Sequence, residues 1–240
     1  MSILNWWKKK KWEKEFENAL EQSSEMRRQF WKTIGEVDND ILTHLINPIF
    51  TGGPKWPATR QRFMRIQKEE TVILASDGLS DPFDTFEETG DNEKYNGYGL
   101  EFYIECDDPI LRNDLEEVKS HWAFQLLYEM SQNAANAGNI ISLFQKYKVL
   151  SIEFSEIEIP ELYLSEDNMV GVLLDVPSPS IKQNIELSYE QVQLVSMKVL
   201  TKDELQYILE YGAEGRLQLA EKCKETGSYH VSFKDRVSLV

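Results

Sequence analysis

The chain has 240 residues, a formal net charge of −15 and a hydrophobic share of 41%. This composition lies close to the globular average and excludes wholesale disorder. The longest apolar runs, such as residues 170–174, fall far short of the ~20 residues that cross a bilayer, and the first residues lack the features of a signal peptide. We therefore expect a cytoplasmic protein, in which Cys106 and Cys223 remain thiols because the compartment is reducing.

Charge is distributed unevenly along the chain. Residues 1–35 hold 8 basic and 5 acidic side chains, so the remainder carries a net charge of −18. A field of that sign slows encounters with nucleic acid and speeds encounters with a basic protein. We expect a basic protein partner and no nucleic acid, although an acidic surface also serves simply to keep a protein in solution.

The first segment combines tryptophans with a run of lysines. Trp6, Trp7 and Trp12 flank residues 8–11, all lysine, and charged helix formers continue to Arg28. We expect a helix over residues 5–34 and treat residues 1–29 as a basic, aromatic segment that precedes a domain over residues 30–240. Lysine beside tryptophan suits an anionic membrane surface, but five glutamates between residues 13 and 25 oppose it. Membrane association is therefore not expected, and packing of the helix onto the body is favoured.

Short β-like runs follow a loop rich in glycine and proline. Residues 62–66 and 71–75 predict a hairpin that turns at residues 68–70, and the second run leads to Asp77 and Gly78, a turn pair. Residues 97–106 predict a further strand. Its alternation of apolar and charged side chains indicates one buried face and one face that is exposed or shared with a partner.

The second half of the chain alternates helix and strand signals. Apolar residues at helical spacing predict one helix that Asn113 or Asp114 caps and Gly138 ends. Strands are expected over residues 157–164, 170–176 and 191–200, the last of them central because it is apolar on both sides. Residues 201–204 match a capping box, and Gly212 is placed to close the helix that follows.

No repeat or low-complexity linker divides the chain. The order of elements indicates an α+β fold, an α/β sandwich in which helices pack on a mixed, mostly antiparallel sheet.

A search for catalytic chemistry finds no local signature. His44, His121 and His230 lack a metal-binding spacing, and neither a nucleophile elbow nor a phosphate-binding loop is present. Residues 97–99, Gly-Tyr-Gly, lack the third glycine of a dinucleotide motif. We expect no cofactor, no metal and no catalytic residue.

Acidic residues crowd one stretch of the chain. Seven acidic residues lie between residue 77, where the turn begins, and Lys94. The aromatic residues in or next to this stretch are Phe83, Phe86, Tyr95 and Tyr98. A solvated loop, a calcium site and a surface that recognises lysine and arginine of a partner all remain open.

Five separated segments together resemble the Suppressor of fused family. They are residues 62–66 leading to 75–82, residues 97–102, the Trp122 helix ending at Gly138-Asn139, residues 170–179 and residues 194–209. In this order they span roughly residues 30–240. The chain is too short to hold the second domain of the animal members and is similar to stand-alone bacterial members.

The resemblance implies a protein-binding module that is not an enzyme. Animal members clamp an extended peptide by adding it as a strand, and bacterial members resemble immunity proteins of toxin systems. Asn139 stands where the animal pattern has an aspartate, so the same ligand is not implied. We expect a set of partner-binding residues formed by Asp77, Asp81, Phe83, Asp84, Glu87, Glu88, Tyr98, Glu101 and Asn139.

Two other functions compete with this one. The first is a hydrolase that uses carboxylates of residues 77–101, with or without a divalent ion. Convergence of Asp77 and Glu101 in a pocket would favour it, whereas a shallow surface with a free strand edge would favour binding. The second is a scaffold apposed to a membrane through Trp6, Trp7 and the lysine run.

Overall fold

A computed structural model describes residues 3–40, 42–43, 50, 52–58, 60–84 and 94–240. A sheet of nine strands forms the centre, in the order β1-β3-β4-β7-β11-β9-β8, with β2 paired to β3 and β10 paired to β11. All neighbours run antiparallel except β7 and β11. These strands are β1 (Glu36–Val37), β2 (Leu42–Thr43), β3 (Arg62–Gln67), β4 (Val72–Asp77), β7 (Leu100–Cys106), β8 (Leu150–Phe154), β9 (Val170–Leu174), β10 (Asn184–Glu186) and β11 (Gln191–Val199).

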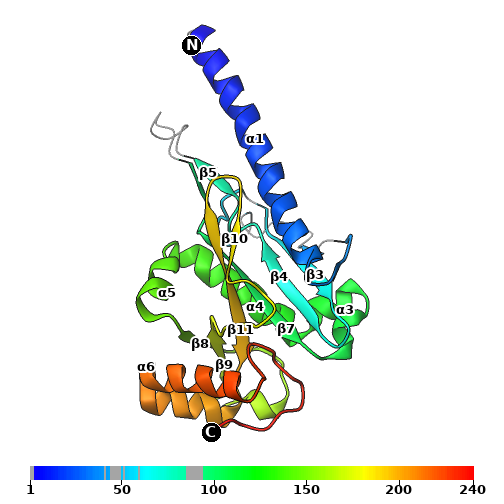
Figure 1. Ribbon diagram of the computed structural model, residues 1–240, viewed down its shortest axis with the longest axis vertical. Coiled ribbons are helices and arrows are strands. Elements are labelled where there is room, and N and C mark those ends of the chain that lie inside the picture. The colour runs from blue at the N-terminus through cyan, green and yellow to red at the C-terminus, as the bar shows by residue number, and fades with distance from the viewer. Residues whose placement is uncertain (1–2, 41, 44–49, 51, 59, 85–93) are drawn as a thin grey trace.

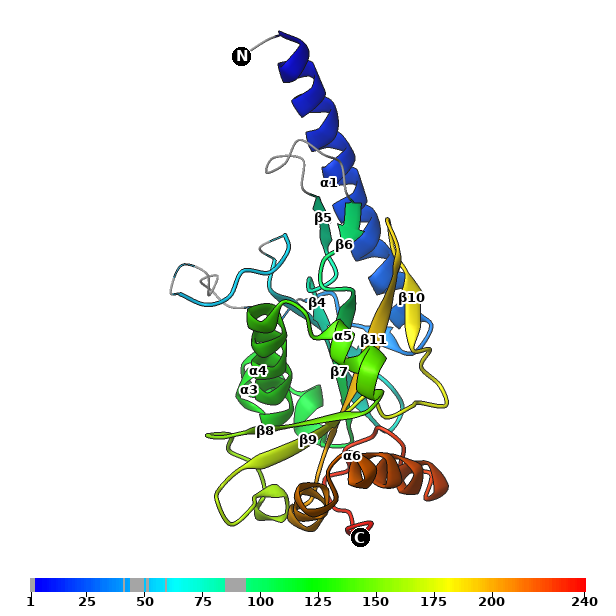
Figure 2. The ribbon, with the colours of Figure 1, turned by 90° about the vertical axis from the view of Figure 1, so that its left-hand side faces the viewer.

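Helices cover both faces of this sheet (Figures 1 and 2). A separate ribbon, β5 (Pro82–Asp84) with β6 (Lys94–Asn96), lies beside the first helix. The helices are α1 (Ile3–Lys32), α3 (Leu115–Ser120), α4 (Trp122–Ala137), α5 (Ile141–Tyr147) and α6 (Lys202–Glu225), with short 3-10 turns η2 (Pro109–Arg112) and η3 (Glu161–Tyr163). The expected α+β sandwich with a mixed, mostly antiparallel sheet is confirmed.

The core divides into clusters on the two faces of the sheet. Phe63, Phe102 and Met197 pack with α4 in the largest cluster. On the opposite face, Trp31 at the end of α1 packs with Tyr103 in a second cluster that also includes β10. A third cluster joins α6 to the β8–β9 end. The sheet is therefore buried between α4 and the second half of α1.

Several sequence predictions agree with these elements. The hairpin over residues 62–77 forms, with Lys68 N donating to Thr71 O across the turn. Strand β11 is central, between β7 on one side and β9 with β10 on the other. Thr201 and Glu204 form a reciprocal capping box at the start of α6.

The strand over residues 100–106 differs from its prediction, because both of its faces are buried along all seven residues. Leu100, Phe102 and Ile104 face α4. Glu101 and Glu105 on the other face are each 1% exposed, because basic side chains of the same chain neutralise them. The expected exposed or shared face of this strand was wrong.

Helix and strand boundaries differ at three other places. His121 is extended and its Nδ1 accepts a hydrogen bond from Ala123 N, so it ends α3 and caps α4 where one helix was expected. Residues 157–164 do not form a strand and contain η3, whereas the preceding strand β8 was not predicted. Gly212 does not close α6 but kinks it, with φ 58° and ψ −129°.

Helix α1 joins the N-terminal segment to the body. Its second half packs against the sheet and its first half extends away from it (Figures 1 and 2). Ala19 is the first buried residue of α1 among those whose side chains are described. The domain division expected after residue 29 falls inside this helix.

Candidate functional site

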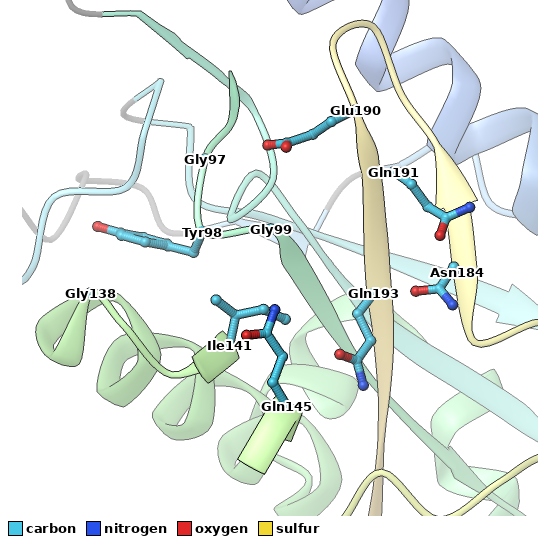
Figure 3. A pocket seen from close by; sticks show the side chains of 10 residues that line it. All are labelled: Gly97, Tyr98, Gly99, Gly138, Ile141, Gln145, Asn184, Glu190, Gln191 and Gln193. Carbon is cyan, nitrogen blue, oxygen red and sulfur yellow. The ribbon is translucent and has the colours of Figure 1, made fainter. Parts of the chain in front are cut away.

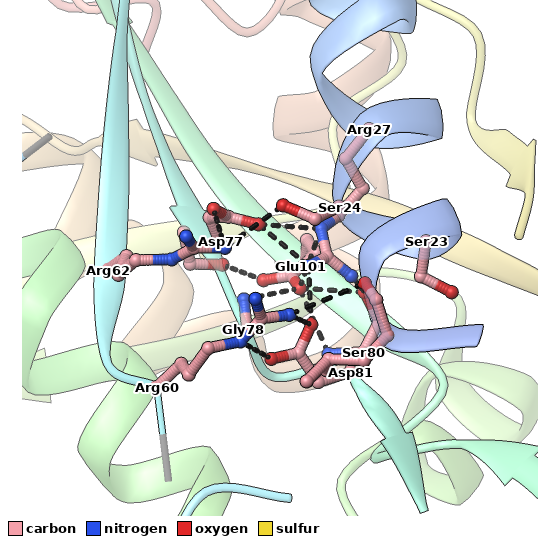
Figure 4. A network of polar contacts seen from close by, with 12 residues as sticks. Ser23, Ser24, Arg27, Arg60, Arg62, Asp77, Gly78, Ser80, Asp81 and Glu101 are labelled. Carbon is pink, nitrogen blue, oxygen red and sulfur yellow. Dashed lines mark hydrogen bonds and ion pairs between the residues drawn. The ribbon is translucent and has the colours of Figure 1, made fainter. Parts of the chain in front are cut away.

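Three of the expected binding residues meet in a buried polar network between α1, β4 and β7 (Figure 4). Arg27 of α1 lies at its centre, fully buried. Its Nε donates to Asp77 Oδ1 at 2.7 Å and its Nη2 donates to Asp81 Oδ1 at 2.6 Å. Arg62 also pairs with Asp77, and Arg60 donates to both oxygens of Asp81. The two aspartates are thus turned toward arginines of their own chain.

Glu101 completes the network from β7. Its Oε1 accepts hydrogen bonds from Gly78 N at 3.0 Å and Ser80 N at 2.9 Å, and its Oε2 accepts one from Ser76 Oγ. A positive φ of 143° at Gly78 turns the chain at this point, where a Cβ atom would lie 2.1 Å from Arg60 O. The sequence Ser76–Asp81 therefore forms a tight turn around the Glu101 carboxylate.

The pKa values in this network follow from burial and charge. Burial alone would raise the pKa of Asp77, but Arg27 and Arg62 outweigh it and hold that pKa below its usual range. Burial raises the pKa of Glu101, and Arg27 only partly offsets it. Asp77 and Glu101 do converge, as a hydrolase would require, but the Arg27 guanidinium fills the space between them. The network holds α1 to the sheet and offers neither carboxylate to a substrate.

A separate groove lies beside the Gly97–Gly99 turn (Figure 3). It has a volume of about 390 Å³. The turn and Tyr98 form one wall, the start of α5 forms another, and the β10–β11 hairpin forms the third. Its lining residues are Gly97, Tyr98, Gly99, Gly138, Ile141, Gln145, Asn184, Glu190, Gln191 and Gln193.

Amide side chains dominate the lining of this groove. Gln145 comes from α5, Asn184 from β10, and Gln191 and Gln193 from one face of β11. Gln193 Nε2 donates to Asp175 Oδ2 at 2.8 Å, which fixes its orientation. Tyr98 is half-buried, and its hydroxyl donates to Lys55 O at 2.9 Å. An amide both donates and accepts, so this surface matches the mixed polarity of a peptide backbone.

The remaining expected site residues lie at other places. Asn139 is exposed directly after Gly138, at the edge of the groove. Phe83 is half-buried in the β5–β6 ribbon, where its ring packs against Tyr95 at a centroid distance of 5.2 Å. The side chains of Asp84, Glu87 and Glu88 lie outside the described residues, as do residues 85–93 of the acidic stretch. Of the expected residues whose side chains the structure describes, Tyr98 and Asn139 adjoin the groove.

Histidine and cysteine side chains form no reactive arrangement in the described part of the chain. His121 caps a helix, and His230 Nε2 lies 2.8 Å from Glu105 Oε2 in the core. Cys106 and Cys223 are both buried thiols, and burial raises the pKa of each. Among the described residues, no group of three or more His, Cys, Asp or Glu side chains could hold a metal ion.

Most of the groove was missed from the sequence. Nothing in the sequence distinguishes Gln145, Asn184 or Gln191 from ordinary surface residues. They meet only because β10 folds back on β11 beside α5. The one local signal is the spacing of Gln191 and Gln193, which places two amides on the same face of a strand.

Comparisons with known proteins identify the family. A family model described as Suppressor of fused protein (SUFU) matches residues 61–236. The chain belongs to the Suppressor of fused family. A search of curated proteins returned no match.

A solved structure of the family shares this fold. A structure titled the Sufu-Fu complex is 16% identical, with a TM-score of 0.53, and the match covers 92% of each chain. Drosophila Suppressor of Fused is also 16% identical, with a TM-score of 0.43, and the match covers 77% of this chain and 41% of that one. By its match to the Sufu-Fu complex structure, the shared fold extends over nearly the whole chain.

Proposed function

We propose that this Suppressor of fused member is a non-catalytic protein-binding module that holds an extended segment of a partner in the groove of Figure 3. The observation that carries the proposal is the pair Gln191 and Gln193. They stand two residues apart on one strand, a separation of roughly 6.7 Å. That spacing equals the repeat of an extended peptide, so successive backbone amides of the partner can meet successive side-chain amides.

The lining of the groove favours a polypeptide over a small molecule. Small-molecule sites are mostly apolar with a few converging polar groups. Here the amides are spread along three elements, and Ile141 and Tyr98 supply the apolar contacts. The structure titled as a complex of Sufu with Fu supports a protein ligand for the family.

Strand addition at β8 is a second route to the same function. Among the described strands β8 pairs only with β9, so its outer edge offers unpaired backbone groups. A cavity of about 650 Å³ adjoins β8 and is lined by five carboxylates, those of Glu153, Glu161, Glu166, Asp167 and Asp203. Both features suit an extended segment that carries lysine or arginine.

The partner class follows from charge. A chain with net charge −15 attracts a basic protein at long range. Together with the similarity to stand-alone bacterial members, this supports a cytoplasmic immunity or sequestering factor that neutralises a basic toxin. The competing hydrolase loses support because Asp77 and Glu101 face Arg27 rather than a cavity.

Affinity capture from the native host, followed by binding measurements with the captured protein, tests the proposal. The variant Gln145→Arg/Gln191→Arg fills the groove with bulk and charge at two exposed positions, and we expect it to weaken binding about 100-fold. The control Gln22→Arg/Gln29→Arg places the same charges on exposed positions of α1. Equal affinity of both variants for the partner would contradict binding in the groove, and a loss only on charge reversal at Glu153 would assign the β8 edge instead.

A further inference from the structure

Two amide side chains of the groove are anchored from behind by carboxylates. Gln193 Nε2 donates to Asp175 Oδ2 at 2.8 Å, and Gln191 Nε2 donates to Glu186 Oε1 at 2.8 Å. Gln193 is half-buried and Asp175 is buried, which limits the access of solvent to their hydrogen bond. Both amides of β11 are therefore held through their nitrogen atoms.

The carboxylates decide which end of each amide faces the groove. An ionised carboxylate only accepts hydrogen bonds, so each amide turns its NH2 group toward it and its oxygen away. Burial raises the pKa of Asp175 to about 6, so this carboxyl group is ionised at pH 7.5. Among the described residues, none donates a hydrogen bond to Gln191 Oε1 or Gln193 Oε1. Figure 3 shows the Gln193 oxygen on the side that faces Gln145, so β11 presents acceptors to the groove.

Glu190 adds a third acceptor at the end of the groove beside the Gly97 turn (Figure 3). Asn96, which is fully buried, holds it at two points. Asn96 N donates to Glu190 Oε1 at 2.8 Å, and Asn96 Oδ1 accepts from Glu190 N at 3.0 Å. The second carboxylate oxygen, Oε2, accepts no hydrogen bond from the described residues. The carboxylate is thus fixed in place with one oxygen available to a ligand.

The charge of Glu190 is not neutralised within the described part of the chain. Its side chain forms no ion pair with any described lysine or arginine, and the described lining of the groove contains neither residue type. Lys94 lies over the ring of the neighbouring Tyr189, but its ammonium group pairs with Glu15 at 3.4 Å. The groove therefore carries a negative charge at a defined position.

An extended polypeptide can supply donors at the matching positions. Residues two apart in an extended chain turn their backbone N–H groups to the same side, roughly 6.7 Å apart. Gln191 and Gln193 have the same separation on β11. Glu190 precedes Gln193 by three residues, roughly 10 Å of extended chain. A carboxylate forms its strongest hydrogen bonds with the cationic side chains of lysine and arginine.

We propose that the groove selects an extended segment that turns the N–H groups of alternate residues toward Gln191 and Gln193 and places a lysine or arginine beside Glu190. This inference rests on the proposed function and adds to it the polarity and the register of the ligand. Glu190 is then the residue that determines specificity, whereas Asp175, Glu186 and Asn96 are positioning residues.

Selection from a library of random linear peptides displayed on phage tests the proposal. The full chain is the target at pH 7.5, and peptides that also bind the variant Gln145→Arg/Gln191→Arg are discarded. We expect the remaining peptides to share a lysine or arginine at one fixed position. The consensus peptide is then synthesised, and its dissociation constant is measured by fluorescence polarisation.

A double-mutant cycle assigns the basic residue to Glu190. Glu190→Gln removes the charge and keeps the bond from Asn96 N, because an amide oxygen also accepts. It should weaken the consensus peptide about tenfold, and glutamine in place of the basic residue of the peptide should cost about as much with the parent protein. The second change should cost little once Glu190 is replaced. The control Glu225→Gln removes the same charge from an exposed position of α6 and should bind as the parent does.

Amide-to-ester replacements along the same peptide test the acceptors of β11, because each one removes a single backbone N–H. We expect losses of about fivefold at two positions that are two residues apart, and little change at the position between them. Equal effects at all three positions would overturn the proposed orientation of Gln191 and Gln193.

The outcomes separate this inference from the function on which it rests. A library that yields no peptide dependent on the groove would contradict both. Peptides that depend on the groove but carry no basic residue at a fixed position, or that bind Glu190→Gln as tightly as the parent, would overturn the selectivity alone and leave an extended ligand in the groove.

Discussion

At the scale of single residues, Arg27 has the largest structural consequence. Three carboxylates surround a fully buried guanidinium, and they belong to strands and turns far from it in sequence. A buried ion pair adds little net stability relative to an apolar replacement of the whole set. Removing one partner is different, because it leaves charge buried without compensation. The network therefore fixes where α1 docks more than it stabilises the fold.

Replacement of Arg27 tests that argument. We expect Arg27→Met to lower the free energy of unfolding by about 3–5 kcal/mol at neutral pH, because Asp77, Asp81 and Glu101 lose their shared cation. Part of the loss should be recovered near pH 5, where Glu101, whose pKa burial already raises in the parent protein, takes up a proton. The measurement is chemical denaturation monitored by fluorescence at both pH values.

The adjacent arginine provides the control for this variant. Arg28 is partly exposed and donates to Asp38 O and to Asn39 at the surface. Arg28→Met should cost less than about 1 kcal/mol. Similar losses at the two positions would show that the buried network has no special role.

Asp175 is a second residue whose charge affects stability, but here ionisation of the carboxyl group lowers the stability of the native state. Burial raises its pKa to about 6, and hydrogen bonds from Gln183 and Gln193 only partly offset this effect. The native state therefore holds a proton that the unfolded state releases near pH 4. Stability must fall as the pH rises from about 4 to 6, and it remains lower above that range.

We expect Asp175→Asn to stabilise the protein by about 2 kcal/mol at pH 7.5, since the neutral amide avoids the buried charge. Asparagine also tolerates the positive φ of 66° found at this residue. The gain should shrink toward pH 5, where the parent carboxyl is already protonated. Thermal or urea unfolding at the two pH values checks this, and a gain that does not change with pH would refute it.

At the scale of secondary-structure elements, local signals were the predictable ones. The hairpin over residues 62–77 and the capping box at Thr201 depend on neighbours in the sequence, and both form as expected. The burial of Glu101 was not predictable, because the cation that neutralises it comes from α1. Helical spacing continues through His121, so only the structure shows the break there.

Helix α6 supplies a prediction about such a break. Gly212 adopts φ 58° and ψ −129° where the helix bends sharply, and a Cβ atom there would meet nothing within 4 Å. The cost of a side chain is therefore conformational and not steric. We expect Gly212→Ala to lower the free energy of unfolding by about 1–2 kcal/mol.

The neighbouring substitution Ala213→Ser serves as the control for this position, with an expected change within about 0.5 kcal/mol. Urea denaturation of the two variants measures the difference. A change near zero for Gly212→Ala would mean that the kink is not required, because α6 could then continue as a straight helix.

At the scale of the whole molecule, charge is divided between two ends. Residues 36–240 carry the acidic excess, whereas the first half of α1 carries the run of lysines at residues 8–11. Composition alone revealed the asymmetry, and the structure places the lysine run on the part of α1 that extends away from the sheet (Figure 1). The sheet edge and the groove could not be located from sequence, since both depend on how distant strands pair.

This division predicts how a basic partner associates. Long-range attraction to the acidic body should raise the association rate constant, while the contacts in the groove set the dissociation rate. Raising the salt concentration from 0.05 to 0.5 M should therefore slow association about tenfold or more and change dissociation little. Surface plasmon resonance or stopped-flow mixing with the captured partner measures both rates.

A charge variant provides the control for this prediction. Replacing each lysine of residues 8–11 with glutamine makes the chain more acidic, so this variant should associate at least as fast as the parent protein. An association rate that does not respond to salt would remove the basis for a basic partner, and binding would then depend on the shape and hydrogen bonding of the groove alone.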